Sequence, residues 1–504
     1  MIMSNASMQH DVAIVGFGPT GVTLANLLGQ AGLSVLVIEK EADIFMLPRA
    51  IHCDGEVMRV FQSLGLKEPL EKVSRPGRAN TFVNAQGEVL MVRNINGDIG
   101  PHGCPNANYF HQPDLEAVLR QGISRYQNVK VLSAHEVTQI QEAEGCVHLD
   151  VQNLSSGGVQ RFSASYVVGC DGGRSLVRKT MGSPMEDLGF HQPWLVFDVL
   201  LKDNAPALPL HTVQHCDPER PMTYCNVIGN RRRWEISVLP SDDLTEMARP
   251  ENLWKLVARW IGPEQADVER AAHYTFHSAI AEGWRKGRLL LAGDAAHLTP
   301  PFLGQGLCAG IRDAANLAWK LEAVVRHHAA DTLLDTYESE RRPHVSVFIK
   351  LAVRLGRIIQ TTDPAEARKR DERFRNSPEI FDPPSPRLGP GVNVGEHATV
   401  GTCFPRLALD NGVPLDFEVG ARFTVISTPA VLSKVSEKTR DLWTKADAAV
   451  LPASASSTLA DWLERHEVEA VLLRPDHYVM GTASSAAELD ALTAHLPLAE
   501  ILSS

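Results

Sequence analysis

The sequence predicts an α/β fold with α+β insertions. A wound parallel sheet is combined with an antiparallel sheet and a small C-terminal α/β domain. Three observations predict this fold. A buried strand, a glycine motif and a helix follow one another in residues 11–40. From about residue 184, prolines, aromatic residues and alternating strands replace that pattern. The last hundred residues mix strands and helices again, after a charged and proline-rich stretch at 363–400.

The first segment carries the spacing of a dinucleotide-binding turn. An apolar run that ends at Val15 predicts a buried parallel strand. Gly16, Gly18 and Gly21 follow at the G-x-G-x-x-G spacing. The first glycine permits a tight turn, the second lets backbone approach a pyrophosphate, and the third lets the helix pack on the strand. Pro19 suits the first turn of that helix, where its missing N–H costs little.

A second strand completes this unit. It covers residues 34–38 and ends in Glu39, where an acid would bind a ribose hydroxyl. A glycine-rich turn in an ordinary βαβ unit is the alternative interpretation. Strand, glycines, helix, second strand and acid occur here in that order, and this order favours dinucleotide binding.

The rest of the first third predicts further α/β elements. We expect a helix from about Asp54, with that residue as its N-cap, and a hairpin over residues 80–93. Residues 95–108 are rich in Gly, Pro and Asn and predict a loop. A helix begins near Asp114, and residues 129–170 alternate in the manner of strands.

The remainder of the chain inserts a second sheet before the buried pattern returns. Alternating strands at 194–201, 222–228 and 234–239 predict an antiparallel sheet. Residues 310–325 form an amphipathic helix, and we expect Pro343 to interrupt the next one. These features predict the following domains: residues 1–183, the first part of the dinucleotide-binding domain; 184–280, an inserted substrate domain; 281–362, the second part of the dinucleotide-binding domain with long helices; 363–400, a linker; and 401–504, a separate C-terminal domain.

A second acidic turn follows a later strand. Residues 169–175 read GCDGGRS, so Asp171 lies between a strand and a basic helix start. Such a turn brings backbone amides near a phosphate-bearing ligand. An ordinary strand-to-helix turn explains it equally well.

A third turn follows the strand that begins at Leu289. This strand ends at Gly293 and Asp294, and ligands of wound sheets lie beyond the carboxyl ends of strands. A proline-rich stretch and then residues 304–306, Gly-Gln-Gly, precede a long helix. Their amides are placed to hold the electron-rich edge of a flavin ring and to stabilise charge on it.

Composition and charge exclude several classes of protein. The 504 residues carry a formal net charge of −11, which disfavours nucleic acid as the main partner. The first residues lack the regions of a signal peptide, and no apolar run reaches the length of a membrane span. We therefore expect a cytoplasmic protein without a membrane partner. The eight cysteines are scattered without a C-x-x-C pair, which favours reduced thiols and predicts no metal site.

The three motifs in this order resemble those of the single-component (class A) FAD-dependent aromatic hydroxylases. Three stretches are most similar to 3-(3-hydroxyphenyl)propanoate hydroxylases and phenol-hydroxylase relatives: PRAIHCDGEVMRVFQSLGL, GDAAHLTPPFLGQGLCAGIRDAANLAWKL and ADWLERHEVEAVLLRPDHYVMGTA. The resemblance covers nearly the whole chain. It implies a Rossmann-like FAD-binding domain, an antiparallel-sheet substrate domain and a C-terminal thioredoxin-like domain.

The resemblance also implies the reaction and the cofactor site. NADH or NADPH would reduce FAD, O₂ would add to form a flavin C4a-hydroperoxide, and one oxygen atom would be delivered to a phenol. The cofactor-binding roles pass to these residues: Gly16, Gly18, Pro19, Thr20 and Gly21 at the pyrophosphate; Glu39 and Lys40 after the second strand; Arg49 by the phosphates; Gln112, Gly293 and Asp294 at the ribityl chain; Asp171 in the DG motif; and Pro301, Gly304, Gln305, Gly306 and Leu307 at the isoalloxazine.

One departure from the family concerns the last of these turns. Many relatives carry Asn near position 308, where this chain has Cys308. Backbone contacts to the flavin should survive that change, whereas a side-chain contact is in doubt. His297, just after the GD motif, is expected to be structural.

The residues that would activate the phenol are less clearly marked. The candidates lie in the middle domain: His211, His215, Tyr224 and Tyr274. A lone His or Tyr in a sheet is more often packed or solvated than catalytic. The three arginines at 231–233 would suit a substrate carboxylate or the nicotinamide phosphate, but a solvated hairpin turn is the favoured interpretation.

Several alternatives remain open. The same fold suits a monooxygenase of a polyketide or heteroaromatic substrate, or a flavin-binding protein without turnover. The intact turn at 304–306 and Asp294 argue against the last of these. We expect a small phenolic substrate, and 3-(3-hydroxyphenyl)propanoate is one candidate. The C-terminal domain lacks C-x-x-C, since Cys403 stands alone, so packing or homodimer formation is expected there and not thiol chemistry.

Overall fold

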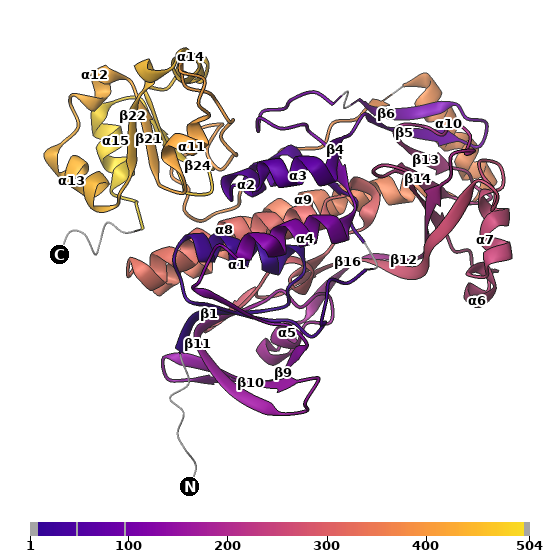
Figure 1. Cartoon of the computed structure of the whole chain (residues 1–504). Helices are drawn as coiled ribbons and strands as arrows, with labels where there is room; N and C mark the ends of the chain where they lie inside the picture. The colour runs from indigo at the N-terminus through magenta and orange to yellow at the C-terminus, as the bar shows by residue number, and fades with distance from the viewer. Residues whose placement is uncertain (1–8, 47–48, 95–96, 378, 498–504) are drawn as a thin grey trace, which may run out of the picture.

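The computed structural model describes residues 9–46, 49–94, 97–377 and 379–497. Residues 1–8, in which no signal peptide is expected, lie outside the described part, as do residues 47 and 48 and residues 95 and 96 of the predicted loop. Two large sheets and a smaller C-terminal unit are arranged around long helices (Figure 1). None of the helices in the described part combines the length and the apolar character that a membrane crossing requires.

The first sheet is the predicted wound sheet. Its strands are β1 (Gln9–Val15), β2 (Val35–Ile38), β8 (Val129–Leu132), β9 (His135–Ala143), β10 (Cys146–Asn153), β11 (Val159–Gly169), β17 (Arg285–Lys286) and β18 (Leu289–Leu291). The order β18–β11–β1–β2–β8 is parallel throughout, while β17, β10 and β9 add antiparallel pairs. Strands β1 and β2 are almost wholly buried, as their apolar runs predict.

Helices cover this sheet and connect it to the rest of the molecule. They are α1 (Pro19–Gln30), α2 (Gly55–Ser63), α3 (Lys67–Val73), α4 (Gln112–Ile123), α5 (Leu176–Met181), α8 (Gly306–Arg326), α9 (Thr336–Ile359) and α10 (Pro364–Asn376). Helix α1 links β1 to β2 and packs against α4 and α8. Asp54 caps α2 by accepting a hydrogen bond from Val57 N at 3.1 Å, which confirms the predicted helix start.

Helix α9 corrects one expectation. It runs through Pro343 without interruption. Proline removes a backbone donor and crowds the preceding turn, so carbonyls there need other partners. The segment at 388–391 approaches this turn, and Gly389 N donates to Glu340 O at 2.9 Å. The buried face of the helix on both sides of the proline keeps it continuous.

The second sheet is mainly antiparallel and draws on distant parts of the chain. In spatial order its strands are β19 (His297–Leu298), β16 (Ala266–Ala281), β12 (Met185–Leu201), β15 (Arg231–Ser237), β14 (Met222–Asn226), β13 (Thr212–Cys216), β5 (Ala79–Asn84), β6 (Val89–Asn94) and β20 (Glu379–Ile380). The predicted hairpin is confirmed as β5 and β6, and it joins this sheet by parallel pairing of β5 with β13. Short helices α6 (Leu244–Met247) and α7 (Pro250–Val257) follow β15.

Smaller elements complete the core of the molecule. Strands β3 (His52–Cys53), β7 (Asn108–Phe110) and β4 (Ser74–Pro76) form a separate three-stranded sheet. The 3₁₀ turns η1 (Gly293–Ala295) and η2 (Pro301–Leu303) lie between β18 and α8, and η3 (Asp331–Asp335) precedes α9.

The C-terminal unit has a four-stranded sheet and its own apolar cores. Its elements are α11 (Leu415–Val419), β21 (Thr424–Ser427), α12 (Pro429–Leu432), α13 (Glu437–Lys445), β22 (Ala449–Pro452), η4 (Ala453–Ala455), α14 (Ser457–Arg465), β23 (Ala470–Leu473), β24 (Val479–Ala483) and α15 (Ala486–Thr493). One core extends onto α8 through Trp319. The thioredoxin-like label for this unit stays a prediction.

Candidate functional site

The three predicted turns meet at one edge of the wound sheet. Val15 pairs with both Gly169 and Ile38, and Gly169 pairs with Leu291. These four residues end parallel strands, so the turns that follow them share the carboxyl edge. A cavity of about 780 Å³ opens there and extends to the second sheet. This edge is where wound sheets bind their ligands.

Two glycines of the motif, Gly16 and Gly21, allow close backbone packing, and Gly18 leaves space for a ligand. Gly16 has a φ of +102°, and a Cβ on it would lie 2.4 Å from Cys170 O. A Cβ on Gly21 would lie 2.1 Å from Gly16 O, so this glycine lets α1 pack on β1. A Cβ on Gly18 would meet nothing within 4 Å, although Gly18 lines the cavity. The open space at the N-terminus of α1 therefore fits a phosphate group.

Glu39 is held in position by backbone donors at the end of β2. Its Oε2 accepts from Phe17 N at 2.7 Å and its Oε1 accepts from Glu41 N at 2.9 Å. Both Glu39 and Lys40 line the cavity. A carboxylate fixed in this way can accept from a ribose hydroxyl next to the phosphate position.

Arg49, Gln112 and Asp294 lie together although they are far apart in sequence. Gln112 begins α4, and its Oε1 accepts from Arg49 N at 2.9 Å and Ala50 N at 2.8 Å. Nη1 of Arg49 lies 3.4 Å from Oδ2 of Asp294. The Arg49 and Asp294 side chains are 61% and 44% exposed, so both are accessible to a ligand in the cavity they line.

Asp171 caps the helix that follows it and keeps one oxygen without a partner. Its Oδ2 accepts from Leu176 N at 2.6 Å at the start of α5. Its Oδ1 is buried and has no hydrogen-bond partner among the described residues. Burial raises the pKa of this carboxyl. Asp171 lines the cavity, so the turn that it holds lies beside the space for a ligand.

The turn before α8 presents backbone to the cavity. Gly304 has a φ of +64°, and a Cβ on it would lie 2.7 Å from Nδ1 of His52. Pro301, Gly304, Gly306 and Leu307 line the cavity at the N-terminus of this 21-residue helix. The helix dipole and the free amides there suit negative charge on a bound ring.

The side chains of this turn point elsewhere. Nε2 of Gln305 donates to Oδ2 of Asp54 at 3.1 Å, and its Oε1 accepts from Arg312. Sγ of Cys308 donates back to Gly304 O at 3.4 Å. Ligand contacts in this region would thus be made by backbone, in keeping with the doubt about a side-chain contact at 308.

A buried cluster behind the turns holds the GD segment in place. Oδ2 of Asp313 accepts from Nε2 of His297 at 2.6 Å and from Gly293 N at 3.0 Å. Its Oδ1 accepts from Nε of Arg341 at 2.9 Å. The structural role expected for His297 is therefore confirmed. Sequence reasoning missed Asp313 and Arg341, because no local motif marks them.

The structure brings one of the four phenol-activating candidates to the cavity. Tyr274 of β16 lines it, whereas His211, His215 and Tyr224 are not among its described lining residues. The Tyr224 hydroxyl donates to Pro209 O at 2.9 Å. Nε2 of His211 lies 3.1 Å from Oγ1 of Thr81.

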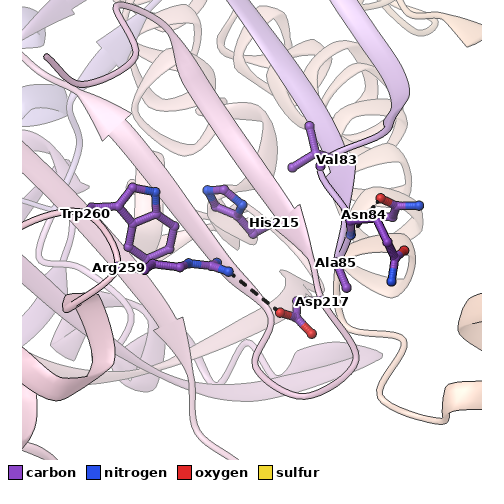
Figure 2. A pocket seen from close by; sticks show the side chains of 9 residues that line it. Val83, Asn84, Ala85, His215, Asp217, Arg259 and Trp260 are labelled. Atoms are coloured by element: carbon purple, nitrogen blue, oxygen red, sulfur yellow. Dashed lines mark hydrogen bonds and ion pairs between the residues drawn. The ribbon is translucent and has the colours of Figure 1, made fainter.

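His215 lines a second, smaller pocket of about 260 Å³ (Figure 2). The centroid of its ring lies 5.0 Å from that of Trp260. The Arg259 guanidinium lies 3.9 Å from the centroid of the Trp260 ring and forms an ion pair with Asp217 (Figure 2). Burial, together with the charge of Arg259, lowers the pKa of His215 to about 4. This pocket contains none of the predicted cofactor residues.

The arginine run at 231–233 is divided between the surface and the interior. Arg231 pairs with Glu269 at 3.0 Å on the exposed side of the sheet. Arg233 is 1% exposed and forms a bidentate pair with Asp198 of β12 at 2.7 and 2.9 Å. Its Nη1 also donates to Arg49 O at 2.7 Å. The solvated-turn interpretation is wrong for Arg233, because β15 directs this side chain to Asp198 of the neighbouring strand and to the cavity.

Further cavity residues were not predicted from the sequence. Arg270 donates to the Tyr274 hydroxyl oxygen at 2.7 Å. Arg93 of β6 lines the cavity and forms no hydrogen bond or ion pair with a described residue. Burial, together with the charge of Arg93, lowers the pKa of the neighbouring His52 to about 4. Sequence alternation predicts such strands but does not reveal which side chains face a ligand.

Comparisons with known proteins agree with this geometry. A family model described as an FAD binding domain matches residues 9–352, and one described as an HcaD C-terminal domain matches residues 402–498. The chain is 37% identical to the "Probable NADH-specific resorcinol 4-hydroxylase" of Rhodococcus jostii (strain RHA1), over 96% of this chain and 94% of that protein. It is 33% identical to the "3-(3-hydroxy-phenyl)propionate/3-hydroxycinnamic acid hydroxylase" of Escherichia coli O139:H28 (strain E24377A / ETEC), over 95% and 92%.

Solved structures share the fold. The flavin-dependent monooxygenase PieE, in complex with FAD and substrate, superposes with a TM-score of 0.82 at 22% identity, over 98% of this chain and 99% of that one. Aklavinone-11 hydroxylase, in a ternary complex with FAD and aklavinone, has a TM-score of 0.82 at 20% identity, over 96% and 98%.

Proposed function

The chain belongs to the family of single-component FAD-dependent aromatic hydroxylases, and from this premise we propose that it hydroxylates a phenol with NADH and O₂. The observation that carries the proposal is the shared cavity. Its 780 Å³ are lined at one end by the cofactor motifs and at the other by Tyr274 of the second sheet. A cofactor and a phenol held in one cavity can react without exposure to bulk water.

The residues at the carboxyl edge fit FAD. Three features of this chain support the assignment: the open space at Gly18, the Asp171 turn at the cavity and the backbone turn at Gly304. The residues that line the cavity and would contact the cofactor are Gly16, Gly18, Pro19, Thr20, Glu39, Lys40, Arg49, Gln112, Asp171, Asp294, Pro301, Gly304, Gly306 and Leu307. Gly21, Gly293 and Gln305 would support these turns from behind. FAD supplies the redox chemistry and the oxygen activation when it is bound.

The polypeptide itself would bind and orient the phenol. The Tyr274 oxygen accepts a hydrogen bond from Arg270, so its own proton can be donated to the phenol oxygen. Phe276 and Phe302 line the same cavity and pack edge to face with ring centroids 6.4 Å apart. These apolar rings would keep water from the reacting atoms.

Arg93 favours a phenol that carries a carboxylate. Its guanidinium reaches the cavity without a protein anion as partner among the described residues. A substrate carboxylate would supply that partner through charge-assisted hydrogen bonds. A 3-(3-hydroxyphenyl)propanoate-like acid is therefore the leading substrate, and a resorcinol-like neutral phenol is the second candidate, since a relative is named for resorcinol.

A substrate panel tests the proposal. The purified protein should be yellow, and NADH oxidation should accelerate with the acidic phenol while oxygen is consumed and a hydroxylated product forms. A protein without an FAD spectrum would contradict the cofactor assignment. Bound FAD without phenol-stimulated NADH oxidation across the panel would favour a flavin-binding protein without turnover.

A further inference from the structure

The C-terminal unit is anchored to the cofactor-binding part by buried ion pairs. Arg59 of α2 forms a bidentate pair with Asp416, at 2.7 and 2.6 Å. Arg474 lies 3.0 Å from Glu340 of α9, and neither side chain is exposed. Buried pairs of this kind are costly to break, because the remaining charge loses its partner. These two ion pairs therefore hold the C-terminal unit against α2 and α9.

A third contact of the C-terminal unit is part of a hydrogen-bond network that reaches the predicted cofactor site. Tyr478 lies just before β24, and its hydroxyl donates to Oε1 of Glu56 at 2.6 Å. The other oxygen of Glu56 accepts from Nε of Arg312 in α8 at 2.7 Å. Glu56 is the second residue of α2 and Arg312 lies two turns into α8, so this contact joins both helix starts to the C-terminal unit.

Arg312 connects Glu56 to the turn before α8 through further hydrogen bonds. Its Nη1 donates to Oε1 of Gln305 at 3.2 Å and its Nη2 donates to Oδ2 of Asp54 at 2.7 Å. Nε2 of Gln305 donates to the same Asp54 oxygen at 3.1 Å. The planar guanidinium thus fixes three acceptors in one geometry. Gln305 and Arg312 are buried, so water does not compete for these bonds.

Gln305 is the middle residue of the turn whose neighbours line the cavity. Gly304 and Gly306 face the cavity, while the Gln305 side chain points into this network. The orientation of the Gly306 and Leu307 amides toward a bound ring therefore depends on where Gln305 is held. Amides fixed in advance stabilise developing negative charge better than mobile ones.

We propose that Tyr478 of the C-terminal unit is a positioning residue for the flavin-binding turn and acts through Glu56, Arg312 and Gln305. The inference rests on the proposed FAD role of Gly304–Leu307. It gives the C-terminal unit a function in tuning the cofactor, in addition to packing. Loosening of the network would reduce the stabilisation of negatively charged, reduced FAD relative to oxidised FAD.

The test compares Tyr478→Phe with Tyr166→Phe in the full-length FAD-loaded protein. Tyr166 of β11 also donates its hydroxyl to a carboxylate, Oδ1 of Asp331 at 2.5 Å, but contacts none of the network. For Tyr478→Phe we expect FAD to dissociate about threefold to tenfold more readily, as loss of one buried charge-assisted bond allows. The ratio of reduced to oxidised FAD should also shift about threefold, which is about 15 mV more negative for a two-electron couple. Tyr166→Phe should leave both quantities unchanged.

A second variant tests the route. Glu56→Gln removes the charge that Arg312 needs, and it leaves the Arg59–Asp416 and Arg474–Glu340 contacts in place. Its shift in potential should not add to that of Tyr478→Phe in the double variant, because both act on one network. Additive shifts, equal shifts in Tyr166→Phe, or an unchanged potential in Tyr478→Phe would overturn the inference. A wild-type protein that binds no FAD would contradict the proposed function instead.

Discussion

The hydroxyl oxygen of Tyr274 lies 2.7 Å from Nη2 of Arg270, which donates a hydrogen bond to it. Both side chains line the cavity whose other end carries the cofactor motifs. Since the oxygen accepts from Arg270, the proton of Tyr274 is available for a ligand. The guanidinium also stabilises negative charge next to the hydroxyl. This pair is well suited to bind the oxygen of a phenol as it loses its proton.

Tyr274→Phe should therefore lower phenol-stimulated NADH oxidation by about 100-fold, because positioned proton donors and acceptors contribute rates of this order. FAD content should stay at the wild-type level. Steady-state kinetics and the flavin absorption spectrum check both expectations. Tyr224→Phe is the matched control, since that hydroxyl bonds Pro209 O away from the cavity. Equal losses in the two variants would remove Tyr274 from the site.

Gly18 and Gly21 should respond differently to alanine. A Cβ at position 18 enters open space beside α1, so Gly18→Ala should weaken FAD binding by at least about tenfold, ~1.4 kcal/mol, with the melting temperature of the FAD-free protein little changed. A Cβ at position 21 would lie 2.1 Å from Gly16 O, so Gly21→Ala should lower that melting temperature. Fluorescence titration with FAD and thermal unfolding separate the two effects. The reverse pattern would contradict the proposed phosphate position.

The wound sheet and its turns were predictable because their signals are local. Apolar runs predict β1 and β2, and Asp54 predicts the start of α2 from its own hydrogen-bonding chemistry. The glycine spacing predicts where backbone segments approach closely, as the contacts of Gly16 and Gly21 confirm.

The part of the cavity that the second sheet lines was not predictable in the same way, because strand pairing between distant parts of the chain creates it. Strand β5 pairs with β13 more than a hundred residues later, which brings Arg93 into the cavity of Tyr274. Arg233 is interior because Asp198 of another strand neutralises it. No local sequence pattern marks the β5–β13 pairing or the Arg233–Asp198 ion pair. The sequence alone therefore could not show whether an arginine at 231–233 is exposed in a turn or buried.

Arg93 should determine the preference for acidic phenols. Arg93→Gln should raise the KM for 3-(3-hydroxyphenyl)propanoate by about tenfold or more, because a charge-assisted bond contributes roughly 1.5–3 kcal/mol. The KM for resorcinol should change little. Arg231→Gln serves as the control, since Arg231 pairs with Glu269 and does not line the cavity. If Arg93→Gln changed the KM for both substrates by the same factor, Arg93 would not bind the substrate carboxylate.

His52 should make the FAD-free protein sensitive to acid. Burial and the charge of Arg93 lower the pKa of His52 from 6.5 to about 4 in the folded state. Below pH 6.5 the unfolded chain therefore binds a proton here that the folded chain does not, so the free energy of unfolding falls as the pH falls toward 4. At pH 5 the loss is about 2 kcal/mol.

His52→Gln removes this titration. The melting temperature of the FAD-free variant should therefore fall less than that of the wild type between pH 7.5 and pH 5.0, whatever its value at pH 7.5. Thermal unfolding at the two pH values measures the difference directly. His135→Gln is a suitable control, because that histidine is part-buried at the cavity rim and bonds Ser133 O and Asn153. If wild type and His52→Gln lose the same stability on acidification, His52 takes up its proton in the folded state, and the buried, neutral imidazole beside Gly304 is ruled out.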